Sequence, residues 1–96
     1  MKSTPENLVK KMVKMVLEQN GIWYYSASAG MYSTGGIPDI VGCHNGKFFG
    51  IEVKSKTGKA TALQLKVGGN ILDAGGMWFI VRDAETLAIA IKEIIG

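Results

Sequence analysis

Apolar residues near the start of the chain recur at helical spacing, and lysines fill much of the surface between them. The apolar stripe consists of Leu8, Val9, Met12, Val13, Val16 and Leu17. Thr4 can cap the first turn, Pro5 suits the first helical position, and Gly21 suits the position just past the last turn. The pattern therefore predicts an amphipathic helix that begins at Pro5 and ends before Gly21.

A strand, a loop and a hairpin are expected after this helix. Residues 22–27 predict a strand, and the small, polar and glycine-rich residues 28–36 predict a loop. Residues 39–44 and 47–53 then flank Asn45-Gly46, the dipeptide that two-residue type I′ turns prefer. We therefore expect an antiparallel hairpin around this turn.

The second half of the chain predicts two helices with a strand between them. Thr61 can cap a helix over about residues 62–74, which Gly75 ends, and residues 77–82 are strongly β-prone. Asp83 can cap a last helix. The expected order is αβββαβα, and we predict one domain over residues 1–96, an α/β (α+β mixed-sheet) sandwich.

The hairpin determines which residues face one another. With a two-residue turn and no bulge, the numbers of facing residues sum to 91, so Asp39 faces Glu52. Their Cβ atoms would lie about 5 Å apart, where two like charges repel by roughly 3 kcal/mol at an effective dielectric constant near 20. We therefore expect a cation between them. Strand alternation places Lys54 on the same face as Glu52.

Two carboxylates and a lysine on one face suit a particular reaction. Carboxylate oxygens are hard ligands that hold Mg²⁺ or Mn²⁺, and these ions bind phosphate oxygens and activate water. A lysine can position or deprotonate that water, or stabilise developing negative charge. The cluster of Asp39, Glu52 and Lys54 thus indicates metal-dependent phosphodiester hydrolysis.

Composition and charge narrow the class of protein. Apolar residues make up 47% of the chain and charged residues 20%, which is typical of a folded globule. The net charge of +3 divides into +4 over residues 1–59 and −1 over residues 60–96, so the first half suits a polyanionic partner. Cys43 is the single cysteine, which excludes an intrachain disulfide, and we expect it to pack as a small hydrophobe.

Apolar runs and aromatic residues carry two further expectations. No apolar run approaches the roughly 20 residues of a membrane span, and no secretory stretch is evident, so we expect a cytoplasmic protein. Aromatic residues in β-prone segments more often fill a core than stack on bases. The residues expected in the core on this ground are Trp23, Tyr24, Tyr25, Trp78 and Phe79.

The motif Gly36-Ile-Pro-Asp39, followed after twelve residues by Glu52-Val-Lys54, resembles the core of the restriction-endonuclease-like nucleases. The nearer resemblance is to the VRR-NUC (virus-type replication and repair nuclease) family. That family typically has an early glutamate, a Gly-x-Pro-Asp element, a Glu-x-Lys element and a glutamine that opens the next helix. The residues that match this order are Glu6, Asp39, Glu52, Lys54 and Gln64.

The resemblance implies a restriction-endonuclease-like sandwich and a DNA endonuclease that uses Mg²⁺ or Mn²⁺ and no organic cofactor. Asp39, Glu52 and the Val53 carbonyl would bind the metal, Lys54 would act on the water or the transition state, and Glu6 and Gln64 would assist. Stand-alone members of this size resemble virus- or phage-borne enzymes of replication, recombination or repair that cut branched DNA such as Holliday junctions. The expected location is then the cytoplasm of a bacterium or of a phage-infected host cell.

Several of these residues have a second interpretation. Glu6 can stabilise the first helical turn, and Thr61 with Gln64 forms a capping-box pattern. His44 at the turn is interpreted as a hairpin residue. The lysines that are candidates for nucleic-acid contacts, and otherwise solvated charges, are Lys10, Lys14, Lys56 and Lys59.

The alternative functions are an inactive nucleic-acid-binding module, or a nuclease that acts on linear DNA or RNA. One small copy neutralises few phosphates, so we expect a homodimer on branched DNA. The Met-rich first helix and the apolar final helix are both candidate interfaces, and the apolar residues of the final helix are Leu87, Ile89, Ile91, Ile94 and Ile95.

Overall fold

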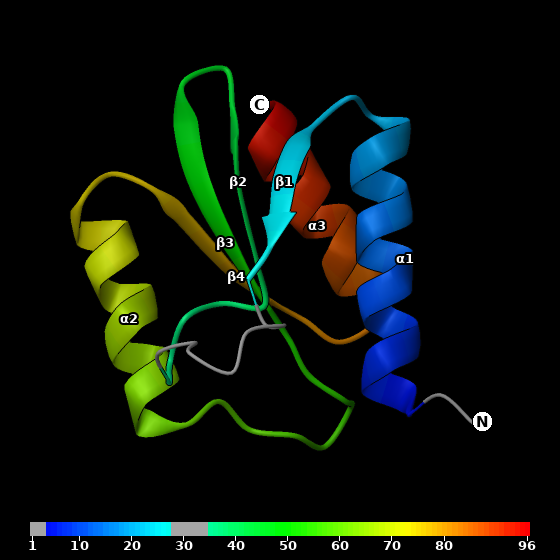
Figure 1. Cartoon of the computed structure of the whole chain (residues 1–96), viewed down its shortest axis with the longest axis vertical. Helices are drawn as coiled ribbons and strands as arrows, with labels where there is room; N and C mark the ends of the chain where they lie inside the picture. The colour runs from blue at the N-terminus through cyan, green and yellow to red at the C-terminus, as the bar shows by residue number, and fades with distance from the viewer. Residues whose placement is uncertain (1–3, 28–34) are drawn as a thin grey trace.

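The computed structural model describes residues 4–27 and 35–96, and its elements follow the predicted order αβββαβα (Figure 1). The elements are α1 (Pro5–Gln19), β1 (Trp23–Ser26), β2 (Ile40–His44), β3 (Lys47–Val53), α2 (Ala62–Asp73), β4 (Met77–Val81) and α3 (Ala84–Ile95). Most of the loop expected at 28–36 lies outside the described residues. The predicted α/β class with a mixed sheet is confirmed.

The sheet has the order β1-β2-β3-β4, in which the first two pairs are antiparallel and β3 pairs with β4 in parallel. Ile40 pairs with Ile51, and His44 pairs with Lys47, so the predicted hairpin register is confirmed. Asn45 has a φ of +52° and Gly46 a φ of +80°, as a type I′ turn requires. His44 therefore lies at the hairpin tip, far along the strand from Asp39.

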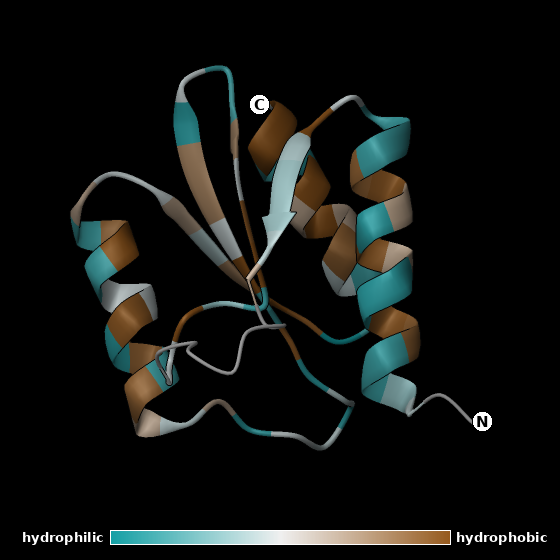
Figure 2. Ribbon diagram, viewed as in Figure 1, coloured by the Kyte–Doolittle hydropathy of each residue, from teal (hydrophilic) through white to brown (hydrophobic). Residues whose placement is uncertain are grey.

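The helices form two outer layers around the sheet. Helices α1 and α3 lie on one face and α2 on the other, against β3 and β4 (Figure 1). Figure 2 shows that α3 is apolar over most of its length, whereas α1 alternates between polar and apolar residues. The buried core consists of Val13, Leu17, Ile22, Ile40, Phe49, Ile51, Val53, Val81, Leu87, Ala90, Ile91 and Ile94.

Side-chain caps set the start of each helix where the sequence indicated them. The Thr4 hydroxyl accepts the Asn7 N–H at 3.1 Å, and capping boxes begin at Thr61 and at Asp83. Within the described parts of the chain, no helix has both the length and the apolar character that a membrane span needs.

Two expectations about packing are wrong. Trp23 and Tyr25 are 65% and 61% exposed, and only Tyr24 of the β1 aromatics packs against the core. Cys43 is exposed as well. The reason is that α2 covers β3 and β4 and does not extend over β1, so residues of β1 and β2 on that side of the sheet have no helix against them.

Helix α2 approaches the sheet closely at Gly68, which lies over the Trp78 ring. A Cβ at this position would lie 2.4 Å from Trp78 Cε2. We therefore expect Gly68→Ala to lower the free energy of unfolding by about 1–3 kcal/mol, because the helix must shift away from β4. The measurement is urea unfolding followed by circular dichroism.

Gly69→Ala is the matched control, because a Cβ at the adjacent position meets nothing within 4 Å. There the substitution should raise the free energy of unfolding by about 0.5–1 kcal/mol through helix propensity alone. Equal effects of the two substitutions would contradict close packing of α2 at Gly68.

Candidate active site

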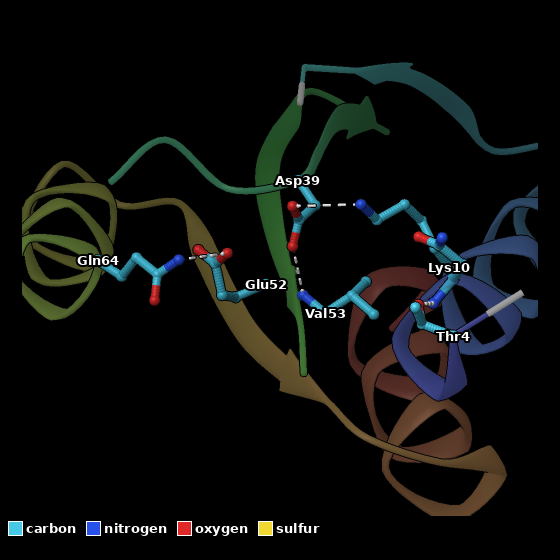
Figure 3. Close-up of polar contacts among 7 residues, drawn as sticks. Thr4, Lys10, Asp39, Glu52, Val53 and Gln64 are labelled. Atoms are coloured by element: carbon cyan, nitrogen blue, oxygen red, sulfur yellow. Dashed lines mark hydrogen bonds and ion pairs between the residues drawn. The ribbon is translucent and has the colours of Figure 1, made fainter. Parts of the chain in front are cut away.

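Asp39 and Glu52 lie where β2 begins and β3 ends. Helices α1 and α2 approach this end of the two inner strands from opposite sides (Figure 3). The hairpin register, continued by one residue beyond Ile40 and Ile51, places the two carboxyl groups opposite each other, as predicted. Glu52 is 1% exposed, whereas Asp39 is half-buried. The structure thus brings a buried and a partly accessible carboxylate together.

The Asp39 side chain also takes the place of a backbone hydrogen-bond acceptor between β2 and β3. Pro38 stands opposite Val53 in the register and has no N–H, so regular pairing stops before it. The Asp39 Oδ2 atom instead accepts the Val53 N–H at 2.8 Å. This explains why β2 begins at Ile40, one residue later than the strand over residues 39–44 that the sequence predicted.

The same pairing geometry leaves the carbonyl oxygen of Val53 without a backbone hydrogen bond. The N–H and C=O groups of one residue point to the same side of a strand, so the Val53 carbonyl faces the side on which Asp39 lies. The register offers this carbonyl no backbone donor, since Pro38 stands opposite it. The Val53 carbonyl is therefore without a backbone donor in this register, and its role as a metal ligand, which the family resemblance implies, stays a prediction.

The segment before Asp39 is held between α2 and the sheet. Gly36 has a φ of +94°, and a Cβ there would lie 2.9 Å from the Leu63 carbonyl oxygen in the first turn of α2. Pro38 is fully buried and packs over Gly50 of β3. The glycine and the proline of this motif thus fix the position from which the Asp39 side chain reaches Val53.

Glu52 has one oxygen that is paired and one that is not. Its Oε1 atom accepts a hydrogen bond from Gln64 Nε2 at 3.0 Å, whereas Oε2 is buried and has no partner among the described residues. The pKa of Glu52 is raised to about 8, and burial is the largest cause. The charge of Asp39, and a hydrogen bond that a protonated Glu52 can donate to Asp39, raise this pKa as well, whereas the charge of Lys54 lowers it. A buried carboxylate in this state requires either a proton or a cation.

Gln64 makes contacts that suit both of the interpretations that the sequence left open. Its Oε1 atom accepts the Thr61 N–H at 2.8 Å and completes the capping box of α2. Its Nε2 atom at the same time donates to Glu52 (Figure 3). The first turn of α2 therefore orients a carboxylate of β3 through one side chain.

Helix α1 supplies charged groups from the other side. Glu6 and Lys10 continue towards the helix N-terminus the stripe that Val13 and Leu17 bury in the core. Lys10 Nζ lies 3.6 Å from Asp39 Oδ1 (Figure 3), and the Glu6 charge is close enough to raise the pKa of Glu52. The sequence placed Lys10 among the nucleic-acid contacts and missed this ion pair, although its spacing of four residues from Glu6 puts both on one helix face.

The basic loop after β3 borders the site. Lys54 is partly buried and its charge lowers the pKa of Glu52, which places it near that carboxylate. Lys56 and Lys59 are exposed in the same loop, and Lys14 lies one turn beyond Lys10 on α1. No contact tests their expected binding to nucleic acid, which stays a prediction.

Arg82, which sequence reasoning missed, holds this loop in place. Its Nη1 atom donates to the carbonyl oxygens of Ser55, at 2.7 Å, and Gly58. Between the loop and the start of α1 lies a pocket of about 490 Å³, lined by Pro5, Leu8, Val9, Lys56 and Thr57, among others. The hydrogen bonds from Arg82 thus keep the loop beside the carboxylates.

The donors at this site fit a hard divalent cation. In the residues that the structure describes, no three side chains of histidine, cysteine, aspartate or glutamate gather as a metal site. Asp39, Glu52 and the Val53 carbonyl provide three oxygens instead, and Mg²⁺ commonly completes its shell with water. The buried Glu52 Oε2 atom, which lacks a partner, is the observation that favours a cation here.

No protein-family model matches the chain, and no curated protein matches it. The resemblance to the VRR-NUC family therefore depends on the motif residues and their order alone.

The raised pKa of Glu52 makes stability depend on pH. Between about pH 4.5 and pH 8 the folded protein holds a proton on Glu52 that the unfolded chain releases, so the free energy of unfolding falls as pH rises through this window. In a chelator, we expect Glu52→Gln to remove this decrease and to be more stable than the wild type above pH 8, by on the order of a few kcal/mol. Urea unfolding at a series of pH values measures the difference.

Glu93→Gln, which changes an exposed glutamate of α3, serves as the control and should leave the pH profile of the wild type unchanged. A wild-type profile that stays flat across the window would show that Glu52 titrates normally.

Proposed function

We propose that the protein is a metal-dependent endonuclease that hydrolyses phosphodiester bonds in DNA, related in its site to the VRR-NUC family. The observation that carries the proposal is the buried Glu52 Oε2 atom, which has no partner in the part of the chain that the structure describes and belongs to a carboxylate opposite that of Asp39. Two adjacent carboxylates, one of them buried, lower the free energy of unfolding, and a cation that also binds phosphate would remove this loss by neutralising their charge. The excess of lysine in the first half of the chain supports a polyanionic substrate.

Each residue of the site has a separate task in this proposal. Asp39, Glu52 and the Val53 carbonyl hold Mg²⁺ or Mn²⁺, which when bound neutralises phosphate charge and lowers the pKa of a coordinated water. Lys54 supplies positive charge next to the carboxylates, where it can stabilise charge that develops on the phosphate or take a proton from water.

The supporting residues hold the ligands in place. Gln64 fixes the Glu52 Oε1 atom, so that the other oxygen keeps its orientation. Lys10 neutralises Asp39 from the α1 side, and Glu6 adds negative charge that favours a cation. Their effects act through the two carboxylates.

We further propose branched DNA as the substrate and a homodimer as the working unit. One copy presents few lysines around the site, and a symmetric pair doubles the phosphates that are neutralised. Helix α1 exposes Leu8 and Met15, and α3 exposes Ile89 and Ile95. Each of these pairs provides apolar surface for a second copy.

The central test uses labelled linear, flapped and four-way DNA, and RNA of matched sequence, with Mg²⁺, Mn²⁺ or a chelator. We expect cleavage only with metal, fastest on branched DNA. Asp39→Asn and Glu52→Gln should each lower the cleavage rate by at least about 100-fold, because each removes a ligand charge. Exposed Glu93→Gln should cleave as the wild type does.

Several outcomes would contradict the proposal. Full activity in chelator would exclude the metal mechanism, and binding without cleavage in every metal would favour an inactive binding module. Equal rates on linear duplex and four-way DNA would exclude the branch preference, and cleavage of RNA alone would point to the other substrate class.

Thr61→Ala and Gln64→Ala separate capping from catalysis. Thr61→Ala removes the cap hydroxyl, at a cost of about 1 kcal/mol, and leaves the contact between Gln64 and Glu52. Gln64→Ala removes the hydrogen bond from the Thr61 N–H to the Gln64 side chain and the contact with Glu52, and it keeps the bond from the backbone N–H of residue 64 to the Thr61 hydroxyl. We expect similar losses of stability for the two variants, but a decrease of about tenfold or more in cleavage rate only for Gln64→Ala. Cleavage that falls equally in both variants would assign Gln64 to the cap alone.

A further inference from the structure

Three large aromatic side chains lie exposed on the sheet. Trp23 and Tyr25 of β1 are joined by Phe48 of β3, which is 44% exposed. The pairing register aligns Trp23 with Cys43 and Cys43 with Phe48, so these side chains form one row across three strands. Tyr25 lies two residues along β1 from Trp23, on the same face.

This face is also the one that carries the candidate active site. Successive residues of a strand alternate between faces, so Phe48 and Glu52 of β3 share a face, as do Cys43 and the position of Asp39 along β2. Four residues of strand separate each pair, which corresponds to about 13 Å. The aromatic row and the carboxylates therefore lie on the same face of the sheet, with Pro38 over Gly50 between Phe48 and Glu52. A few nucleotides would span this distance.

A hollow adjoins the row at Phe48. It measures about 300 Å³, lies between β3 and α2, and is lined by Phe48, Val67, Asn70 and Ile71 together with Ala74 and Gly76. An apolar hollow with a single amide at its wall suits a flat heterocycle, because the amide provides both a donor and an acceptor.

We propose that Trp23, Tyr25 and Phe48 form a stacking platform for unpaired bases of the DNA that the Asp39–Glu52 site cleaves. This inference rests on the proposed function and specifies its substrate, which has a single-stranded segment beside the cleavage position. Aromatic faces stack on any base, but only on bases that are not already stacked inside a duplex. The face that the aromatics share with the carboxylates, and the excess of lysine over residues 1–59, to which all three strands of the row belong, favour nucleic acid over a protein partner.

The test measures affinity in a chelator, so that no cleavage occurs, by fluorescence anisotropy of a labelled oligothymidylate of about twelve nucleotides and of a blunt duplex. Trp23→Ala should lower the ratio of oligothymidylate affinity to duplex affinity about tenfold. Trp23→Phe keeps an aromatic face and should retain most of the ratio. Leu72→Ala removes a comparably exposed apolar side chain from α2 and should leave the ratio unchanged.

Parallel measurements separate the possible failures. Wild-type protein that neither binds nor cleaves DNA would overturn both this inference and the proposed function. Wild-type protein that cleaves DNA, with an unchanged ratio in Trp23→Ala, would overturn the platform alone. If Trp23→Ala instead halves the mass measured by light scattering and leaves the ratio unchanged, the face is an interface between copies of the chain.

Discussion

The burial of one carboxylate, that of Glu52, is the main constraint on the structure of this small domain. Glu52 lies in the sheet at 1% exposure, with one oxygen held by Gln64 and the other without a partner among the described residues. Burial of an unpaired carboxylate opposes folding unless a proton or a cation neutralises it. The turn at Asn45-Gly46, the close approach of Gly36 to α2 and the capping box of α2 all determine where this carboxylate and Asp39 lie.

The part of this site that depends on local rules could be predicted from the sequence. A two-residue turn sets the register of the hairpin, and the register places Asp39 opposite Glu52 without any knowledge of the helices. The capping pattern likewise identified Gln64, although it could not decide between its two roles. The structure shows that the two contacts are compatible, since the oxygen of the amide caps α2 while its nitrogen reaches Glu52.

Contacts between distant elements could not be predicted in this way. Arg82 reaches the carbonyl of Ser55, and Lys10 reaches Asp39, only because of how β4 and α1 pack on the rest of the fold. The error over Trp23 and Tyr25 has the same origin. Strand propensity indicates a pleated surface, but which part of that surface is covered depends on the position of α2.

The places where the chain departs from local rules coincide with the chemistry that we propose for it. Helix caps, turn residues and the core all agree with the observed fold, so the sequence is locally consistent over most of its length. It departs from this consistency at the paired carboxylates and at the exposed aromatics. Each departure lowers stability, and large exposed apolar groups typically mark binding surfaces. Both departures lie on one face of the sheet. A divalent cation would neutralise the carboxylates, and a ligand that binds this cation through phosphate oxygens and also presents flat rings would satisfy the two departures together. Nucleic acid with unpaired bases has both properties.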